Sequence, residues 1–202
     1  MIHRTPAMIA TTSFAEYATS DRTRRTQIVT GRSALPTVDF YGPILRALRQ
    51  AAASDEPEPL LSAAIDATEL SGQTRAYTEL SDGFLTWWKR TRATLTATGS
   101  SNLRVGDVDV TVTPHLGMRS SAGEQVVLFH LKEQPLTKDA ANAALRVLQI
   151  CMSDLLPGAT PLVVDLRRAR EFRLARNTNV ERLDAWLTAQ AAALATHLEE
   201  SA

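Results

Sequence analysis

The chain contains one cysteine, only three lysines, no long apolar run and no formal net charge. A lone thiol, Cys151, excludes an intrachain disulfide and is typical of the reducing cytoplasm, where we expect the protein to be located. The absence of an apolar run near the roughly 18 residues that span a bilayer predicts no membrane partner, and residues 1–13 make a poor signal peptide. The balance of 22 basic and 22 acidic residues argues against nucleic-acid binding by the whole surface, but it leaves room for a local basic patch.

Several common motifs are also missing. The sequence has no Ser-His-Asp signature, no glycine-rich phosphate-binding loop and no CxxC pair. Its 202 residues and 44% hydrophobic content suit one well-buried domain rather than two.

The order of apolar patterns along the chain predicts helices first and strands later. Helical spacing covers residues 14–29, with Ser13 as N-cap, and residues 38–53, 60–70 and 73–96; strand patterns cover residues 103–112, 125–132, 161–166 and 171–175. Residues 114–123 connect the first two strands, and helices cover residues 137–155 and 178–199. We therefore expect an α/β fold with a central mixed β-sheet flanked by helices, in which residues 1–71 form an N-terminal helical extension of a core over residues 72–202.

Polar side chains interrupt two of these strands. In the first, Asp107 and Asp109 alternate with valines, so they lie on the opposite face. The second is apolar on both faces, which predicts a central strand, and it ends in His130 and Lys132. Because lysine is so scarce in the chain, Lys132 stands out in an apolar strand.

This layout resembles the PD-(D/E)XK nuclease superfamily, whose restriction-endonuclease-like core consists of a helix, a three-strand meander, a helix and a strand. The resemblance covers residues 73–199 and is closest to the RecB-like and phage-type exonuclease branch. Gly-Asp-Val-Asp at residues 106–109 matches the Gly-x-x-Asp element of that branch, and His-Leu-Lys at residues 130–132 occupies the place of its acidic-x-Lys tripeptide. Gln149 matches the glutamine on the following helix. An alternative alignment puts Pro114-His115 at the Pro-Asp position, and both alignments share Lys132.

The resemblance implies a metal-dependent phosphodiesterase site with Asp109, His130 and Lys132 as catalytic positions, and Asp109, His130 and Glu79 as metal ligands. In the family two carboxylates hold a magnesium ion that activates water, and the lysine stabilises the developing charge. A neutral imidazole is a poor magnesium ligand, so His130 predicts an impaired site without a metal cofactor; an active site would use Mg²⁺ or Mn²⁺. Glu133 could replace the missing acid only if the strand ends or bulges before it.

A run of arginines provides the best candidates for phosphate contacts. They are Arg167, Arg168, Arg170 and Arg173, and the resemblance adds Gln149 as a nucleic-acid-binding residue. An equally good interpretation is a solvated hairpin in which Asp165 and Glu171 balance the arginines.

Three functional hypotheses follow. The first is a divergent, catalytically impaired PD-(D/E)XK-like protein that acts in nucleic-acid metabolism, with DNA as a candidate partner, or as a non-catalytic partner of such machinery. The second is an active metal-dependent DNA nuclease that uses Asp109, His130 and Lys132. The third is a protein–protein interaction module without a nucleic-acid role, with a second copy of the chain or another protein as its partner.

Overall fold

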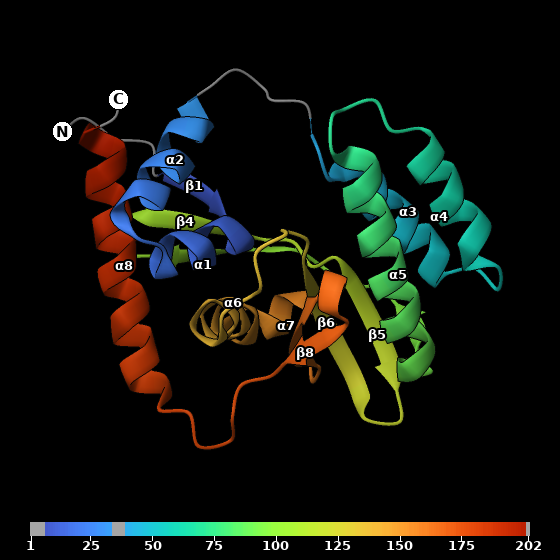
Figure 1. Cartoon of the computed structure of the whole chain (residues 1–202). Coiled ribbons are helices and arrows are strands. Elements are labelled where there is room, and N and C mark those ends of the chain that lie inside the picture. The colour runs from blue at the N-terminus through green and yellow to red at the C-terminus, as the bar shows by residue number, and fades with distance from the viewer. Residues whose placement is uncertain (1–6, 34–38, 201–202) are drawn as a thin grey trace.

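The computed structural model describes residues 7–33 and 39–200 and shows an α/β protein with two mixed β-sheets flanked by helices (Figure 1). The N-terminal part contains β1 (Ala7–Ala10), α1 (Thr11–Thr19), α2 (Arg22–Ser33), α3 (Gly42–Ala52), α4 (Pro57–Asp66) and α5 (Gln73–Thr91). Five strands follow: β2 (Thr94–Thr96), β3 (Ser101–Val105), β4 (Val108–Val112), β5 (Leu116–Ser120) and β6 (Gly123–His130). The remaining elements are α6 (Lys138–Ile150), α7 (Met152–Leu155), β7 (Thr160–Asp165), the 3₁₀ turn η1 (Leu166–Arg168), β8 (Arg170–Phe172) and α8 (Val180–Glu200). No helix in the described residues combines the length and apolar content needed to cross a membrane.

The larger sheet has five strands in the order β2-β5-β6-β7-β8. Strands β2, β5 and β6 form an antiparallel meander, β7 lies parallel to β6 after the crossover through α6, and β8 returns antiparallel to β7. The predicted central strand is confirmed as β6, where every residue from Gln125 to Phe129 is buried. The strand ends at His130, two residues earlier than the apolar pattern suggests.

The predicted connection at residues 114–123 contains a strand instead, β5. This strand escapes pattern analysis because its first three residues are all buried, so polar and apolar residues do not alternate. Gly117 lies at the crossing with β2, where a Cβ atom would collide with the side chain of Thr98 and the carbonyl oxygen of Thr96. This glycine allows β5 to pair closely with β2. In the sequence pattern the same glycine indicates a break between elements.

The smaller sheet has the order β1-β4-β3. The predicted single strand at residues 103–112 is a hairpin of β3 and β4, which reverses at Gly106 with a φ of 56°. Glycine adopts this left-handed conformation without strain. The periodicity of the sequence does not reveal the turn, because the alternation of buried valines continues through β4. Strand β1 pairs in parallel with β4, so the N-terminal segment predicted as helical also supplies a strand.

The predicted helix at residues 14–29 is two helices, α1 and α2. Helix α1 begins directly after β1, with Ala10 rather than Ser13 at its N-cap. The break lies at Ser20 and Asp21, where the Ser20 hydroxyl donates to the Glu16 carbonyl at 2.7 Å and the Asp21 carboxylate accepts from the Arg24 amide at 2.8 Å. These side-chain hydrogen bonds compete with continued helix and favour a new start.

Other helix ends differ from the pattern by a few residues. The start predicted at residue 38 lies outside the described residues, and α3 begins at Gly42 with a proline in its first turn. Helix α4 begins at Pro57 rather than residue 60, because proline is well tolerated in a first turn. Helix α5 ends at Thr91, where Arg92 takes a left-handed φ of 47° and releases the chain into β2.

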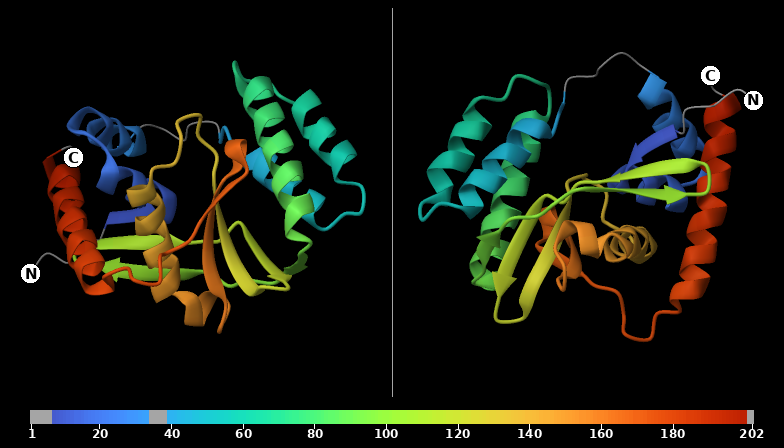
Figure 2. Two further views of the ribbon diagram at one scale, coloured as in Figure 1. Left: turned by 60° about the horizontal axis from the view of Figure 1, so that its bottom comes forward. Right: turned by 180° about the vertical axis from the view of Figure 1, so that it is seen from behind.

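Helices cover the two faces of the larger sheet, and a separate core lies on each face. On one face α6 packs on the sheet, and the core continues into α1, α8 and the smaller sheet. On the other face α3, α4 and α5 form one core with β5, β6 and β7. Trp87 on α5 is fully buried in this core and donates from Nε1 to Glu171 at 2.9 Å. Figure 2 shows the two helical groups on opposite sides, with the loop that follows β6 between them.

Candidate functional site

Lys132 lies in the loop between β6 and α6, just beyond the end of the strand. Its ammonium group donates to Glu16 on α1, and the two side chains are 39% and 21% exposed. Arg24 on α2 donates to the other oxygen of the same carboxylate from Nε at 2.8 Å and from Nη2 at 2.6 Å. Lys132 is therefore held by the N-terminal helices.

The environment of Glu16 keeps its carboxylate ionised. Burial acts to raise the pKa of Glu16, but the hydrogen bonds and positive charges of Lys132 and Arg24 outweigh it, so that the pKa lies below its ordinary value. A carboxylate with two cations is thus the immediate neighbour of Lys132.

Asp109 and His130, both predicted catalytic positions and metal ligands, belong to different sheets. Asp109 lies on β4 and accepts from Nη1 of Arg104 on β3 at 3.0 Å. His130 ends β6, where its Nε2 lies 2.7 Å from the carbonyl oxygen of Gln134. The two side chains therefore make separate local contacts, one in each sheet.

His115 lies next to the end of β6, as the Pro114-His115 alignment implies. It precedes β5, and its Nδ1 accepts from the amide of Phe129 at 2.7 Å. Burial, with a smaller contribution from the positive charge of Arg49, lowers the pKa of His115 to about 4, so its imidazole is neutral at pH 7. Of the two positions aligned with the family's first acid, Asp109 and His115, His115 is the one that directly precedes the strand paired with β6.

Glu79, the third predicted metal ligand, forms ion pairs on α5. It accepts from Arg75 at 2.8 Å and from Arg167. The hydrogen bond from Arg75, opposed by desolvation and assisted by Arg167, lowers the pKa of Glu79 below its ordinary value. Where side chains are described, no three or more His, Cys, Asp or Glu residues gather closely enough to hold a metal ion.

The predicted arginine patch is largely occupied by contacts within its own hairpin. Arg168 donates to Asp165, which is 1% exposed, at 3.2 Å, and Arg173 donates to Glu171 at 3.1 Å. Arg170 lies over the ring of Phe172 at 4.8 Å. Gln149 is on the far part of α6, where it accepts from Arg146 at 2.8 Å. The pairs with Asp165 and Glu171 agree with the balanced-hairpin interpretation for Arg168 and Arg173, whereas Arg170 contacts an aromatic ring instead.

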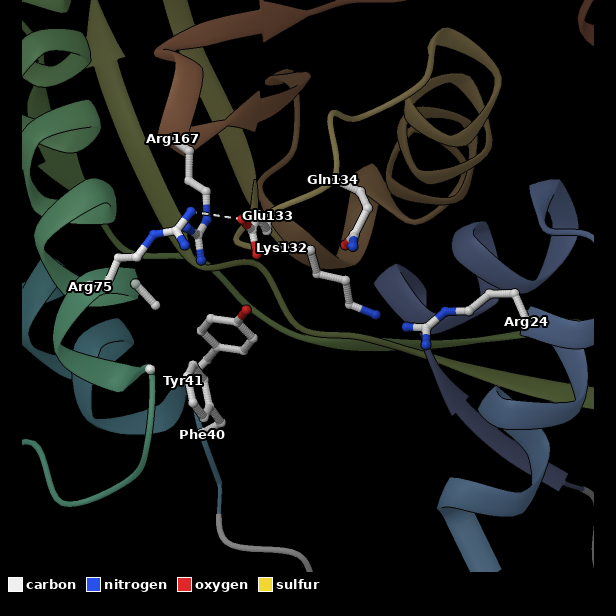
Figure 3. Close-up of a pocket in the computed structure, with 10 residues that line it drawn as sticks. Arg24, Phe40, Tyr41, Arg75, Lys132, Glu133, Gln134 and Arg167 are labelled. Atoms are coloured by element: carbon white, nitrogen blue, oxygen red, sulfur yellow. Dashed lines mark hydrogen bonds and ion pairs between the residues drawn. The ribbon is translucent and has the colours of Figure 1, made fainter.

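The fourth arginine, Arg167, faces a cavity beside Lys132. The cavity has a volume of about 420 Å³ and is lined by Arg24, Phe40, Tyr41, Gly72, Arg75, Ala76, Lys132, Glu133, Gln134 and Arg167. Figure 3 shows Arg24 on one side, Arg75 and Arg167 on the other, and Lys132 and Gln134 between them. Four cationic side chains from separate segments thus converge on one hollow.

Glu133 reaches this cavity because β6 ends before it. Its carboxylate accepts a hydrogen bond from Arg75 at 2.8 Å, and the two side chains form an ion pair between the loop and α5. The strand ends before Glu133, which is the condition under which Glu133 could replace the missing acid.

The resemblance assigns none of five further residues to this site: Glu16, Arg24, Phe40, Tyr41 and Arg75. All but Arg75 lie in the N-terminal extension, which the resemblance does not cover. The one available signal was the cluster of arginines at residues 22–25, whose carboxylate partner lies in the preceding helix.

Comparison of the chain with protein-family models and with the curated proteins finds no match.

Proposed function

We propose that the protein is a divergent member of the PD-(D/E)XK nuclease-like group that binds nucleic acid and is impaired in metal-dependent cleavage. Its topology supports this assignment. Helix α5, the meander β2-β5-β6, helix α6 and the parallel strand β7 follow one another in the order of the restriction-endonuclease-like core, with the β3-β4 hairpin inserted after β2.

The observation that carries the proposal is a pair of histidines at the neighbouring ends of β5 and β6, of which His130 precedes Lys132 by two residues. Hydrogen bonding between Phe129 and His115 puts one imidazole at the start of β5, and His130 ends β6. Nuclease-like sites place carboxylates at such positions, because magnesium prefers oxygen ligands and needs negative charge to hold it. Imidazole rings there supply neither oxygen ligands nor negative charge, which favours loss of magnesium-dependent chemistry.

The cavity supports nucleic-acid binding in place of cleavage. Arg24, Arg75, Lys132 and Arg167 line it, and arginine and lysine side chains are the usual partners of phosphate oxygens. Arg167 is only 8% exposed and is held by the Leu131 carbonyl at 3.0 Å, so its guanidinium is fixed before a ligand arrives. A preorganised cation loses little conformational entropy on binding.

The test compares binding and cleavage in one set of proteins. Wild type, Lys132→Ala and the control Lys89→Ala are incubated with single- and double-stranded DNA in EDTA, Mg²⁺ or Mn²⁺. Lys89 lies on α5, 14 residues beyond Arg75 and so about 21 Å along the helix. We expect binding by wild type and Lys89→Ala, weaker binding by Lys132→Ala, and no cleavage with either metal.

Two outcomes would contradict the proposal. Cleavage by wild type that disappears in Lys132→Ala would identify an active nuclease. Absence of DNA binding at low ionic strength would favour the protein-interaction hypothesis.

A further inference from the structure

We propose that the cavity takes an unpaired nucleotide of a single-stranded nucleic acid, with its phosphate on Lys132, Arg75 and Arg167 and its base against Tyr41. This inference rests on the proposed function, and it specifies which form of nucleic acid the site recognises. The observation behind it is that cations and aromatic rings line the same hollow.

The cationic side of the cavity keeps a surplus of positive charge. Its four cations face the carboxylates of Glu16, Glu79 and Glu133, which leaves one formal positive charge in the network. The arginine–carboxylate pairs use only some of the available donors, because an arginine has five N–H groups and an ammonium has three. A phosphate can therefore bind Arg75 and Arg167 while their ion pairs stay in place, and it competes with Glu16 for Lys132.

The aromatic side is formed by Phe40 and Tyr41, just before α3. Their rings meet edge to face, with centroids 4.8 Å apart. The Phe40 carbonyl accepts from the Tyr77 hydroxyl at 2.8 Å and from the Gln73 amide at 3.1 Å, which anchors the pair to α5. Figure 3 shows the Tyr41 hydroxyl directed toward the Lys132 and Glu133 side of the cavity.

This combination discriminates between single and double strands. Proteins that bind single strands pair a cationic track with aromatic side chains on which bases stack, and this works because an unpaired base exposes its flat face. In a duplex the faces are covered by neighbouring bases, so Tyr41 has nothing to stack on. A cavity of about 420 Å³ lies within the range of small-ligand sites, which suits one nucleotide rather than a helix.

The experiment measures fluorescence anisotropy with labelled oligonucleotides of equal length: oligo-dT, oligo-U, an abasic DNA strand and a DNA duplex. Thymidine monophosphate serves as a competitor. The variants are Tyr41→Leu, the ring-preserving control Tyr41→Phe, and Lys132→Gln, each checked for an unchanged thermal unfolding midpoint.

We expect oligo-dT and oligo-U to bind more tightly than the abasic strand and the duplex. Tyr41→Leu should weaken oligo-dT binding by at least about fivefold, in line with the loss of one base–aromatic stack, and Tyr41→Phe should bind like wild type. Abasic and duplex affinities should not change in Tyr41→Leu. The difference between oligo-dT and oligo-U then separates DNA from RNA as the source of the strand.

The inference is overturned if the abasic strand or the duplex binds as tightly as oligo-dT, or if Tyr41→Leu has no effect. Thymidine monophosphate that competes as strongly as oligo-dT would also overturn it in favour of a free nucleotide. These outcomes differ from failure of the proposed function, in which no nucleic acid binds or Lys132→Gln leaves all affinities unchanged.

Discussion

Lys132 donates to the carboxylate of Glu16, 116 positions earlier in the chain. The lysine follows the central strand of the larger sheet, whereas Glu16 belongs to an N-terminal helix beside the smaller sheet. This contact joins the N-terminal helices to the end of the larger sheet's central strand at the candidate site. It also means that a ligand phosphate and Glu16 compete for the same ammonium group.

Removing the Glu16 charge should therefore strengthen anion binding. We expect Glu16→Gln to bind single-stranded DNA a few times more tightly at low ionic strength, because Lys132 and Arg24 lose their internal counter-charge. The free energy of unfolding should change by no more than about 1 kcal/mol, because the pair is partly exposed. Anisotropy titration and urea unfolding measure both effects, with Glu181→Gln on α8 as control. Weaker DNA binding by Glu16→Gln would mean that Glu16 orders the site rather than competing for it.

Stability should fall between pH 7 and pH 5 because of His115. Its pKa is about 4 in the folded protein against an ordinary value of 6.5, so the unfolded chain binds more protons in this interval. The stabilisation is fully present above the ordinary pKa and is lost as the pH falls toward the folded value. The expected loss from pH 7 to pH 5 is at most about 2 kcal/mol.

Urea unfolding at pH 7, 6 and 5 measures this slope. His115→Gln should flatten it, whereas His130→Gln should retain it. Glu16 has little influence in this interval, because its pKa is lowered from 4.5 and its carboxylate is ionised in both states. An unchanged slope in His115→Gln would assign the pH dependence to other groups.

The position of Arg167 depends on close contact between α5 and η1. A Cβ atom at Gly83 would collide with the carbonyl oxygen of Leu166, the residue before Arg167. We expect Gly83→Ala to lower the free energy of unfolding by about 1–3 kcal/mol and to weaken DNA binding, because the helix must move away from the turn.

Gly31→Ala is the matched control for this variant. Gly31 is also helical, on α2, and no neighbouring atom lies within 4 Å of the added Cβ. It should stabilise the protein by roughly 0.5 kcal/mol through helix propensity. Equal effects of the two substitutions would show that the contact with η1 is unimportant.

The parts of the fold that were predictable are those with a local pattern. Strand β6 is recognisable because it is apolar on both faces. Thr137, the first residue of a predicted helix, caps α6 by accepting from the Ala140 amide at 3.2 Å. The β3-β4 turn at Gly106 is not recognisable, because the alternation of polar and apolar residues continues through it. Strand β5 is not recognisable, because this alternation is absent from it. In both places a glycine determines the geometry without leaving a hydrophobic signal.

The candidate site was predictable only around Lys132. The choice between Asp109 and His115 as the residue beside β6 depends on strand pairing, which spacing along the chain does not determine. Glu16 and Tyr41 come from segments whose place in the fold depends on long-range packing. Charge pairing over such distances has no local sequence signal.

The salt dependence of single-stranded DNA binding in EDTA tests the central claim most directly. The comparison uses wild type and an Arg75→Gln/Lys132→Gln double variant, whose substituted side chains line the cavity. The account predicts that the wild-type association constant falls steeply with salt, and that the variant binds more weakly with a slope reduced by about 0.7 per lost phosphate contact. Equal affinity and equal slope in the two proteins would contradict it, because DNA would then bind elsewhere.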